Sequence, residues 1–179
     1  MARMFRFLTA DEIEVKVKQV KENGLVCLLY KTARTDMDLL DETVGAGNWT
    51  NDYKEIKGNL YAGIGIIQEN CGIQWKWDCG IESREDEEGN QKKGEASDAF
   101  KRAGFRWGIG RELYTSPFVW IPSNKAEIKA SSFNGKTRFN CYDKFSVEKI
   151  AYDEKTGRIT GLAIRNDTKN LRAFVWQQS

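Results

Sequence analysis

A cluster of cations in the middle of the chain has the residue types needed to bind an anionic polymer. Lys101 and Arg102 are adjacent, and Arg106 follows four residues after Arg102. Lysine and arginine neutralise phosphates, and aromatic rings such as Phe100 and Trp107 can stack on bases at about 1–3 kcal/mol each. This combination is typical of a groove for a single nucleic acid strand. A solvated helix face would have the same residue types, so the cations alone do not decide between the two.

The sequence lacks the residues that several common enzymatic mechanisms require. The chain has no histidine, which excludes Ser-His-Asp and Cys-His catalysis and mixed Cys/His zinc sites. Its four cysteines form no C-x-x-C pair, so free thiols in a reducing cytosol are expected rather than a zinc site. Gly104, Gly108 and Gly110 have the wrong spacing for a phosphate-binding loop, and G-x-x-x-x-G-K-[ST] does not occur. We expect no catalytic residue, no metal and no cofactor.

Two alternative functions remain open at this stage. A metal-dependent nuclease could use Asp78, Glu82 and the Glu127-x-Lys129 pair, although Glu82 belongs to an acidic loop. A monomeric RNA- or single-strand-binding module, with antiparallel strands and a packed helix, would contain the same elements.

Charge is segregated along the chain. The net charge is only +2, from 28 basic and 26 acidic residues, but residues 82–88 sum to −4 while residues 91–111 sum to +4 and residues 125–149 to +3. This distribution is compatible with one basic face. The length of 179 residues and the hydrophobic content of 40% suit one globular domain. The N-terminal apolar run is too short for a signal peptide or a membrane span, so we expect no membrane association.

The cations belong to a helix predicted within residues 94–114. Five small or aromatic residues fall on or beside one face of it: Ala96, Ala99, Phe100, Ala103 and Trp107. Such a face predicts close packing on a sheet. Arg102 and Arg106 lie beside this face, and Lys101 points away from both. Asp98 is an i,i+4 partner for Arg102, whereas Arg106 has no acidic partner at that spacing.

Two helices are predicted nearer the N-terminus. The first runs from the capping box Thr9–Glu12 to Asn23-Gly24, and three apolar residues follow at helical spacing: Ile13, Val17 and Val20. The second begins at a cap on Thr35 and ends at Gly45.

Strands are predicted over 25–30, 49–56, 60–67, 73–81, 145–152, 158–165 and 171–176, with an irregular crossing over 115–140. In residues 73–81 apolar and polar residues alternate, which predicts one buried face carrying Trp75 and Trp77 and one polar face carrying Lys76 and Asp78. The predicted fold class is therefore α+β: an antiparallel β-β-β-α core with a packed helix, N-terminal helices and a β-rich C-terminal segment.

Three blocks of this sequence resemble the Rad52 superfamily, including the phage Sak-type single-strand annealing proteins. The helix EASDAFKRAGFRWGIG matches the family's signature helix, the segment ARTDMDLLDETVGAGNW matches its arginine-containing helix and turn, and Trp77-Asp78-x-Gly80 matches its hairpin. The resemblance covers roughly residues 25–115. Within the single domain expected over 1–179, it implies an annealing core at 25–115, which leaves a β-rich extension at 116–179.

The resemblance implies a function and a site. Family members bind single-stranded DNA without ATP, assemble into homo-oligomeric rings and anneal complementary strands in recombination and repair. By position, Lys101 and Arg102 match the DNA-contacting pair and Arg34 the helix arginine, while Arg106 lies one residue after a further basic position of the family. The expected partners are single-stranded DNA and further copies of the chain, in the cytoplasm of a bacterium or phage-infected host. A single-strand-binding protein or a recombinase is a partner that the sequence leaves open.

Overall fold

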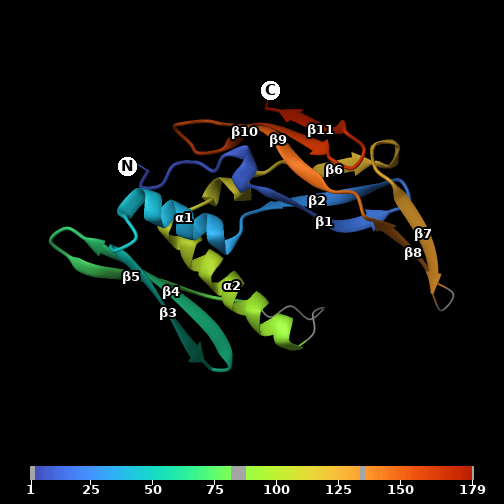
Figure 1. The fold of residues 1–179 in the computed structure, drawn as a ribbon. Helices are drawn as coiled ribbons and strands as arrows, with labels where there is room; N and C mark the ends of the chain where they lie inside the picture. Colours follow the sequence, from blue (N-terminus) through green and yellow to red (C-terminus); the bar gives the residue numbers. More distant parts are fainter. Residues whose placement is uncertain (1–2, 82–87, 134–135, 179) are drawn as a thin grey trace. The chain divides into compact units, whose positions relative to one another are not determined.

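The computed structural model describes residues 3–81, 88–133 and 136–178, and the chain forms two compact units (Figure 1). The first unit contains Met1–Arg6 and Lys31–Gly110. The second contains Phe7–Tyr30 and Arg111–Ser179. The chain thus leaves the second unit after residue 30 and returns to it after residue 110.

The first unit contains both α-helices of the described residues and one antiparallel sheet. Helix α1 spans Ala33–Val44, and strands β3 (Trp49–Ile56), β4 (Asn59–Gln68) and β5 (Gly72–Cys79) pair in the order β3-β4-β5. Helix α2 spans Glu88–Trp107 and packs across β4 and β5 and against α1 (Figure 1).

The core of this unit lies between α2 and the sheet. Ile64 and Ile66 of β4 and Phe100 and Ala103 of α2 are fully or almost fully buried. Gly80, just after β5, lets the helix approach, since a Cβ atom there would clash with the carbonyl oxygen of Glu95. The aromatic and small face predicted for this helix is thus its buried face.

The two faces of β5 are exchanged relative to the prediction. Lys76 and Asp78 point towards α2, while Trp75 lies on the outer face, where its side chain is 38% exposed. The indole rings of Trp75 and Trp77 stack on each other and lie over Gly65 and Gly63 of β4. Alternation in the sequence predicts that a strand has two different faces, but it does not predict which face packs against the helix. Here the polar face packs against α2, where Lys76 and Asp78 form hydrogen bonds and an ion pair.

The second unit is built from strands. Six of them form an antiparallel sheet in the order β11-β10-β9-β1-β2-β6, and two form a separate hairpin, β7–β8. Strands β6 and β11, at opposite ends of the order, also contact each other, so the sheet is nearly closed. The bounds are β1 Glu14–Lys21, β2 Gly24–Tyr30, β6 Val119–Pro122, β7 Ile128–Phe133, β8 Lys136–Cys141, β9 Phe145–Tyr152, β10 Ile159–Asn166 and β11 Leu171–Gln177.

The predicted α+β fold class is wrong, because the described residues are mostly β and one predicted N-terminal helix does not exist. Residues 9–23 form a single 3-10 turn, Ala10–Glu12, followed by β1. The Thr9 amide does donate to the Glu12 carboxylate at 2.8 Å, but this cap closes only that turn. Val15 and Val17 also alternate with charged residues, and pairing with β2 selects the strand.

Smaller corrections concern the ends of elements. The irregular crossing predicted at 115–140 contains β6, β7 and β8, and the N-cap of α1 is Thr32 rather than Thr35. The acidic segment 82–94 was predicted as a loop, but helix α2 already begins at Glu88, and residues 82–87 lie outside the described residues. The end of α1 at Gly45 is confirmed, with a φ of 86°.

Candidate functional site

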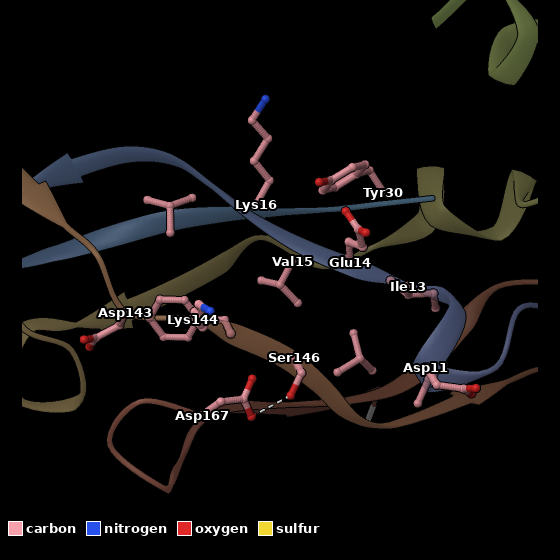
Figure 2. Close-up of a pocket in the computed structure, with 14 residues that line it drawn as sticks. Asp11, Ile13, Glu14, Val15, Lys16, Tyr30, Asp143, Lys144, Ser146 and Asp167 are labelled. Carbon is pink, nitrogen blue, oxygen red and sulfur yellow. Dashed lines mark hydrogen bonds between the residues drawn. The ribbon is translucent and has the colours of Figure 1, made fainter. Parts of the chain in front are cut away.

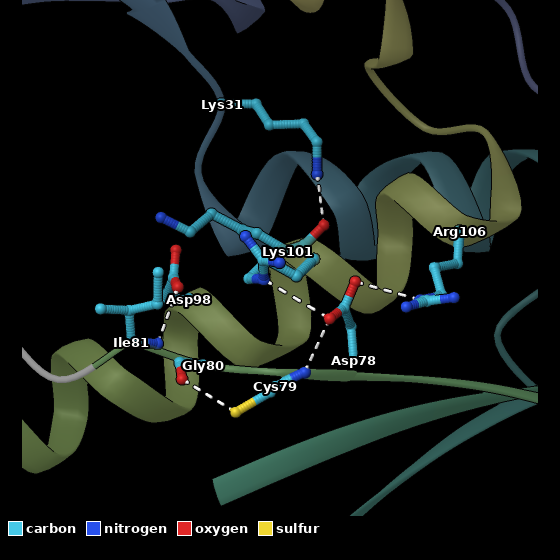
Figure 3. A network of polar contacts seen from close by, with 9 residues as sticks. Lys31, Asp78, Cys79, Gly80, Ile81, Asp98, Lys101 and Arg106 are labelled. Carbon is cyan, nitrogen blue, oxygen red and sulfur yellow. Dashed lines mark hydrogen bonds and ion pairs between the residues drawn. The ribbon is translucent and has the colours of Figure 1, made fainter. Parts of the chain in front are cut away.

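Two of the predicted cations of α2, Arg102 and Arg106, meet a single carboxylate from the neighbouring strand. Asp78 of β5 accepts a hydrogen bond from Nε of Arg106 at 3.0 Å, and its other oxygen lies 3.5 Å from Nε of Arg102 (Figure 3). The two arginines are one turn apart on the same flank of the helix, as the helical spacing predicted. Asp78 therefore lies between two guanidinium groups that would otherwise repel each other.

Asp78 is ionised in this arrangement. Burial works to raise the pKa of Asp78, but the hydrogen bond from the Cys79 amide at 2.8 Å and the two guanidinium groups outweigh it. The pKa of Asp78 is consequently lowered from its ordinary value. At neutral pH the group is one carboxylate shared by two cations, with a net charge of +1.

The arginines remain accessible on their outer side. The side chain of Arg102 is 37% exposed and that of Arg106 is 59% exposed, whereas Asp78 is only 17% exposed. Lys76, on the same face of β5, adds a third cation: its Nζ donates to the carbonyl of Arg106 at 3.1 Å and lies 4.2 Å from the centre of the Trp107 ring. The cluster can thus present several N–H donors to an anion from solvent.

Lys101 lies on a different flank of α2. Its positive charge helps to lower the pKa of Asp36 in α1, and its carbonyl accepts a hydrogen bond from Nζ of Lys31 at 3.2 Å. Lys31 and Asp36 form a buried ion pair at 2.5 Å, with neither side chain more than 1% exposed. Burial raises the pKa of Asp36 to about 6, with the charge of Lys31 opposing it. This pair ties α1 to the cation-bearing part of α2.

Arg34 is exposed in the first turn of α1. Within the described residues its side chain makes no hydrogen bond or ion pair, so its guanidinium is available to solvent. The structure therefore brings Arg102 and Arg106 together, and places Lys101 and Arg34 elsewhere on the two helices of the same unit.

Sequence reasoning missed the carboxylate at the centre of this site. It assigned Asp98 to Arg102 and no acid to Arg106, but Asp98 instead accepts the amide of Ile81 at 3.0 Å. The signal was present in the alternation of β5, which puts Lys76 and Asp78 on one face. That polar face was predicted to lie opposite the buried face of the strand.

The arrangement does not favour metal chemistry. Of the candidate nuclease residues, Asp78 is held by two guanidinium groups, and Glu82 lies outside the described residues. Among the residues that the structure describes, no group of three or more cysteine, aspartate or glutamate side chains is placed to bind a metal ion. In the same residues, no helix is both long and apolar enough to cross a membrane.

The second unit has a groove of about 840 Å³ between β1 and β9 (Figure 2). The two strands share one paired position, Glu14 with Ser146, and diverge beyond it, which leaves the space. Apolar side chains such as Val15 line it together with charged groups of both signs, including Lys16 and Asp143. None of the predicted site residues lines this groove, and its mixed charge does not select an anionic ligand.

A family model matches residues 36–131, and it describes Rad52/22 family double-strand break repair proteins. The matched segment is more than half of the chain. The chain belongs to the Rad52/22 family. The resemblance seen in the sequence is thereby confirmed. Searches of curated proteins and of solved structures give no match.

Membership of the Rad52/22 family connects the chain to DNA recombination and repair. The matched segment begins within α1, two residues after Arg34, and ends within β7. It includes the whole of β5 and α2, and with them Asp78, Lys101, Arg102 and Arg106. The family match and the cation cluster therefore fall on the same elements.

Proposed function

We propose that this Rad52/22 family chain binds single-stranded DNA and anneals complementary strands without ATP, as a homo-oligomeric ring. The DNA-binding residues of the proposal are Lys101 and Arg102, with Arg34 and Arg106 as further contacts. One observation carries it: the segment matched by the family contains a helix whose two partly exposed arginines, Arg102 and Arg106, are held side by side around Asp78.

The mechanism needs no bond chemistry. Two complementary strands repel each other through their phosphates, and cations that neutralise one backbone lower this barrier. The bases must stay accessible, which suits a site made of lysine and arginine rather than of rings that enclose a base. Phe100 is 1% exposed in the core, so it does not act as a stacking platform.

The site is tested with the double variant Lys101→Ala/Arg102→Ala. Its affinity for a labelled single-stranded oligonucleotide at fixed salt should fall on the order of tenfold, because two phosphate contacts are lost. The charge-matched control is Lys21→Ala/Lys155→Ala, which removes two exposed lysines of the second unit. Unchanged affinity in a folded double variant, or an equal loss in the control, would contradict the site assignment.

The activity is tested separately. The wild-type protein should accelerate annealing of complementary oligonucleotides in the absence of ATP, and mass measurement in solution together with electron microscopy should find closed rings. Failure to accelerate annealing would refute the function, and a monomer would refute the ring. The same proposal includes an annealing core at residues 25–115 and a β-rich extension at residues 116–179. It also includes a cytoplasmic location in a bacterium or phage-infected host, and a single-strand-binding protein or recombinase as a further partner.

A second candidate function is favoured by the outer face of the three-stranded sheet. Trp75 and Trp77 stack there with ring centres 5.4 Å apart, and Lys54 lies 4.2 Å from the centre of the Trp77 ring. Aromatic residues on an open sheet face are how several RNA-binding modules stack bases. A monomeric protein whose nucleic acid affinity depends on Trp75, but not on Lys101 and Arg102, would favour this alternative.

A further inference from the structure

The central feature of the site is a carboxylate, Asp78, that already pairs with the two arginines. Asp78 contacts Nε of both Arg102 and Arg106, at 3.5 and 3.0 Å, and most of its side chain is shielded from solvent. Strand β5 holds the carboxylate in place, because the Cys79 amide donates to it at 2.8 Å. Asp78 is therefore a fixed group, unlike a flexible surface acid that could move away from an arriving phosphate.

Both guanidinium groups approach Asp78 through Nε and are partly exposed to solvent. The side chains of Arg102 and Arg106 are 37% and 59% exposed. Nε of Arg102 is itself buried and makes no hydrogen bond that meets normal geometry, so its contact with Asp78 is electrostatic only. A phosphate arriving from solvent would meet the outer donors, while the carboxylate behind them partly cancels their charge.

We infer that Asp78 is a built-in counter-anion of the nucleic acid site, which lowers its affinity for phosphate and so makes strand binding readily reversible. The inference rests on the proposed function, since it concerns the same site and the same ligand, single-stranded DNA. An annealing protein must bring strands together and then release the duplex, and a site at maximal positive charge would release it slowly. Affinity differences within one interface lie mostly in the dissociation rate.

The test is Asp78→Asn, which removes the charge and keeps the shape. Affinity for single-stranded DNA at fixed low salt should rise about threefold to tenfold, the size expected for one nearby surface charge. Dissociation of a labelled strand into excess unlabelled competitor should slow by a similar factor. Glu154→Gln makes the same charge change in the exposed turn between β9 and β10 of the second unit, and should leave both values nearly unchanged.

The arginines provide a second control. In the Arg102→Ala/Arg106→Ala background, Asp78→Asn should raise affinity much less, because of the three cations of the cluster only Lys76 remains to hold a phosphate near Asp78. Equal or weaker binding by Asp78→Asn in the wild-type background would overturn the inference, and so would an equal gain from Glu154→Gln or a gain of undiminished size without the arginines. If Asp78→Asn fails to fold by circular dichroism, Asp78→Thr takes its place, since threonine suits a strand and accepts a hydrogen bond from Nε.

These outcomes separate the inference from the proposed function. Wild-type protein that binds no single-stranded DNA refutes the function itself. Wild-type protein that binds, loses affinity in Lys101→Ala/Arg102→Ala, and gains none in Asp78→Asn refutes only the role of Asp78.

Discussion

Gly104 of α2 packs directly against the buried Lys31–Asp36 ion pair. A Cβ atom at this position would clash with the carboxylate of Asp36 and lie 3.4 Å from Nζ of Lys31. The clash is with a buried charged group that cannot swing into solvent. A glycine inside a helix ordinarily costs stability, so its presence here follows from packing rather than from helix propensity.

The prediction is that Gly104→Ala destabilises the protein by about 1–3 kcal/mol, the usual range for overpacking a buried site. The matched control is Gly94→Ala in the same helix, where an added Cβ would meet no atom within 4 Å. There the change should stabilise the protein by roughly 0.5–1 kcal/mol through helix propensity. Urea unfolding of both variants measures the difference, and effects of the same sign would contradict the packing argument.

The four thiols differ in their exposure to solvent, and Cys27 and Cys71 are the two extremes. Cys27 in β2 is 2% exposed, and burial raises the pKa of Cys27 to about 12, with the nearby Cys141 as a second cause. Cys71, in the turn between β4 and β5, is exposed. Because the thiolate is the reactive form, burial protects Cys27 both sterically and electrostatically.

We expect a thiol reagent at pH 8 to modify Cys71 in a fast phase and Cys27 only when the protein unfolds. Mass spectrometry of peptides taken at early and late times identifies the modified residues. Cys71→Ser should remove the fast phase without changing the protection of Cys27. Early modification of Cys27 in native protein would show that β2 is less shielded than its burial indicates.

At the scale of elements, the Lys31–Asp36 pair connects the segment before α1, α1 itself and α2. Nζ of Lys31 contacts the carboxylate, the carbonyl of Lys101 and, at 4.2 Å, the centre of the Phe105 ring. A buried ion pair adds little net stability compared with apolar residues of similar size, but breaking it leaves one charge buried without compensation.

The single variants Lys31→Met and Asp36→Leu should therefore each destabilise the protein by about 3–5 kcal/mol, and the double variant should recover most of the loss. Chemical unfolding of the four proteins forms a double-mutant cycle. Additive losses in the double variant would mean that the two groups act independently, which their 2.5 Å contact argues against.

The sequence predicts a helix or strand well where the local residue pattern determines it, and poorly where pairing with a distant strand determines it. Strands β3, β4 and β5 were predicted nearly to their ends, since turn residues bound each of them: Asn70 and Gly72 both have positive φ values, 64° and 69°. Residues 14–21 were mistaken for a helix, because Ile13, Val17 and Val20 fit a helical spacing while pairing with β2 decides the outcome.

The candidate site was likewise predicted only where local spacing determines it. Helical spacing was sufficient to place Arg102 and Arg106 on one flank of α2 beside its buried face. The partner on that flank, Asp78, comes from a strand 24 residues earlier than Arg102, and only the packing of α2 on β5 brings them together. The buried Lys31–Asp36 pair was not predicted at all, since two charged residues near a helix start ordinarily indicate a solvated cap.

At the scale of the whole molecule, a net charge of +2 is too small to attract DNA by itself, so the proposed DNA binding has to come from the local clusters. Each phosphate contact releases condensed counterions, and for single strands the logarithm of the affinity falls with the logarithm of salt concentration by about 0.7 per contact. The slope therefore counts the contacts, independently of their strength in any one buffer.

We expect Lys101→Ala/Arg102→Ala to make this slope shallower by about 1.4, corresponding to two lost contacts. Lys155→Ala, in the exposed turn between β9 and β10 of the second unit, should leave the slope unchanged even if it lowers affinity slightly through net charge. Fluorescence anisotropy titrations between about 50 and 200 mM salt give the slopes. An unchanged slope in the double variant would mean that Lys101 and Arg102 make no phosphate contacts. Equal changes in both variants would mean that binding depends on the overall charge of the protein rather than on the cations of α2.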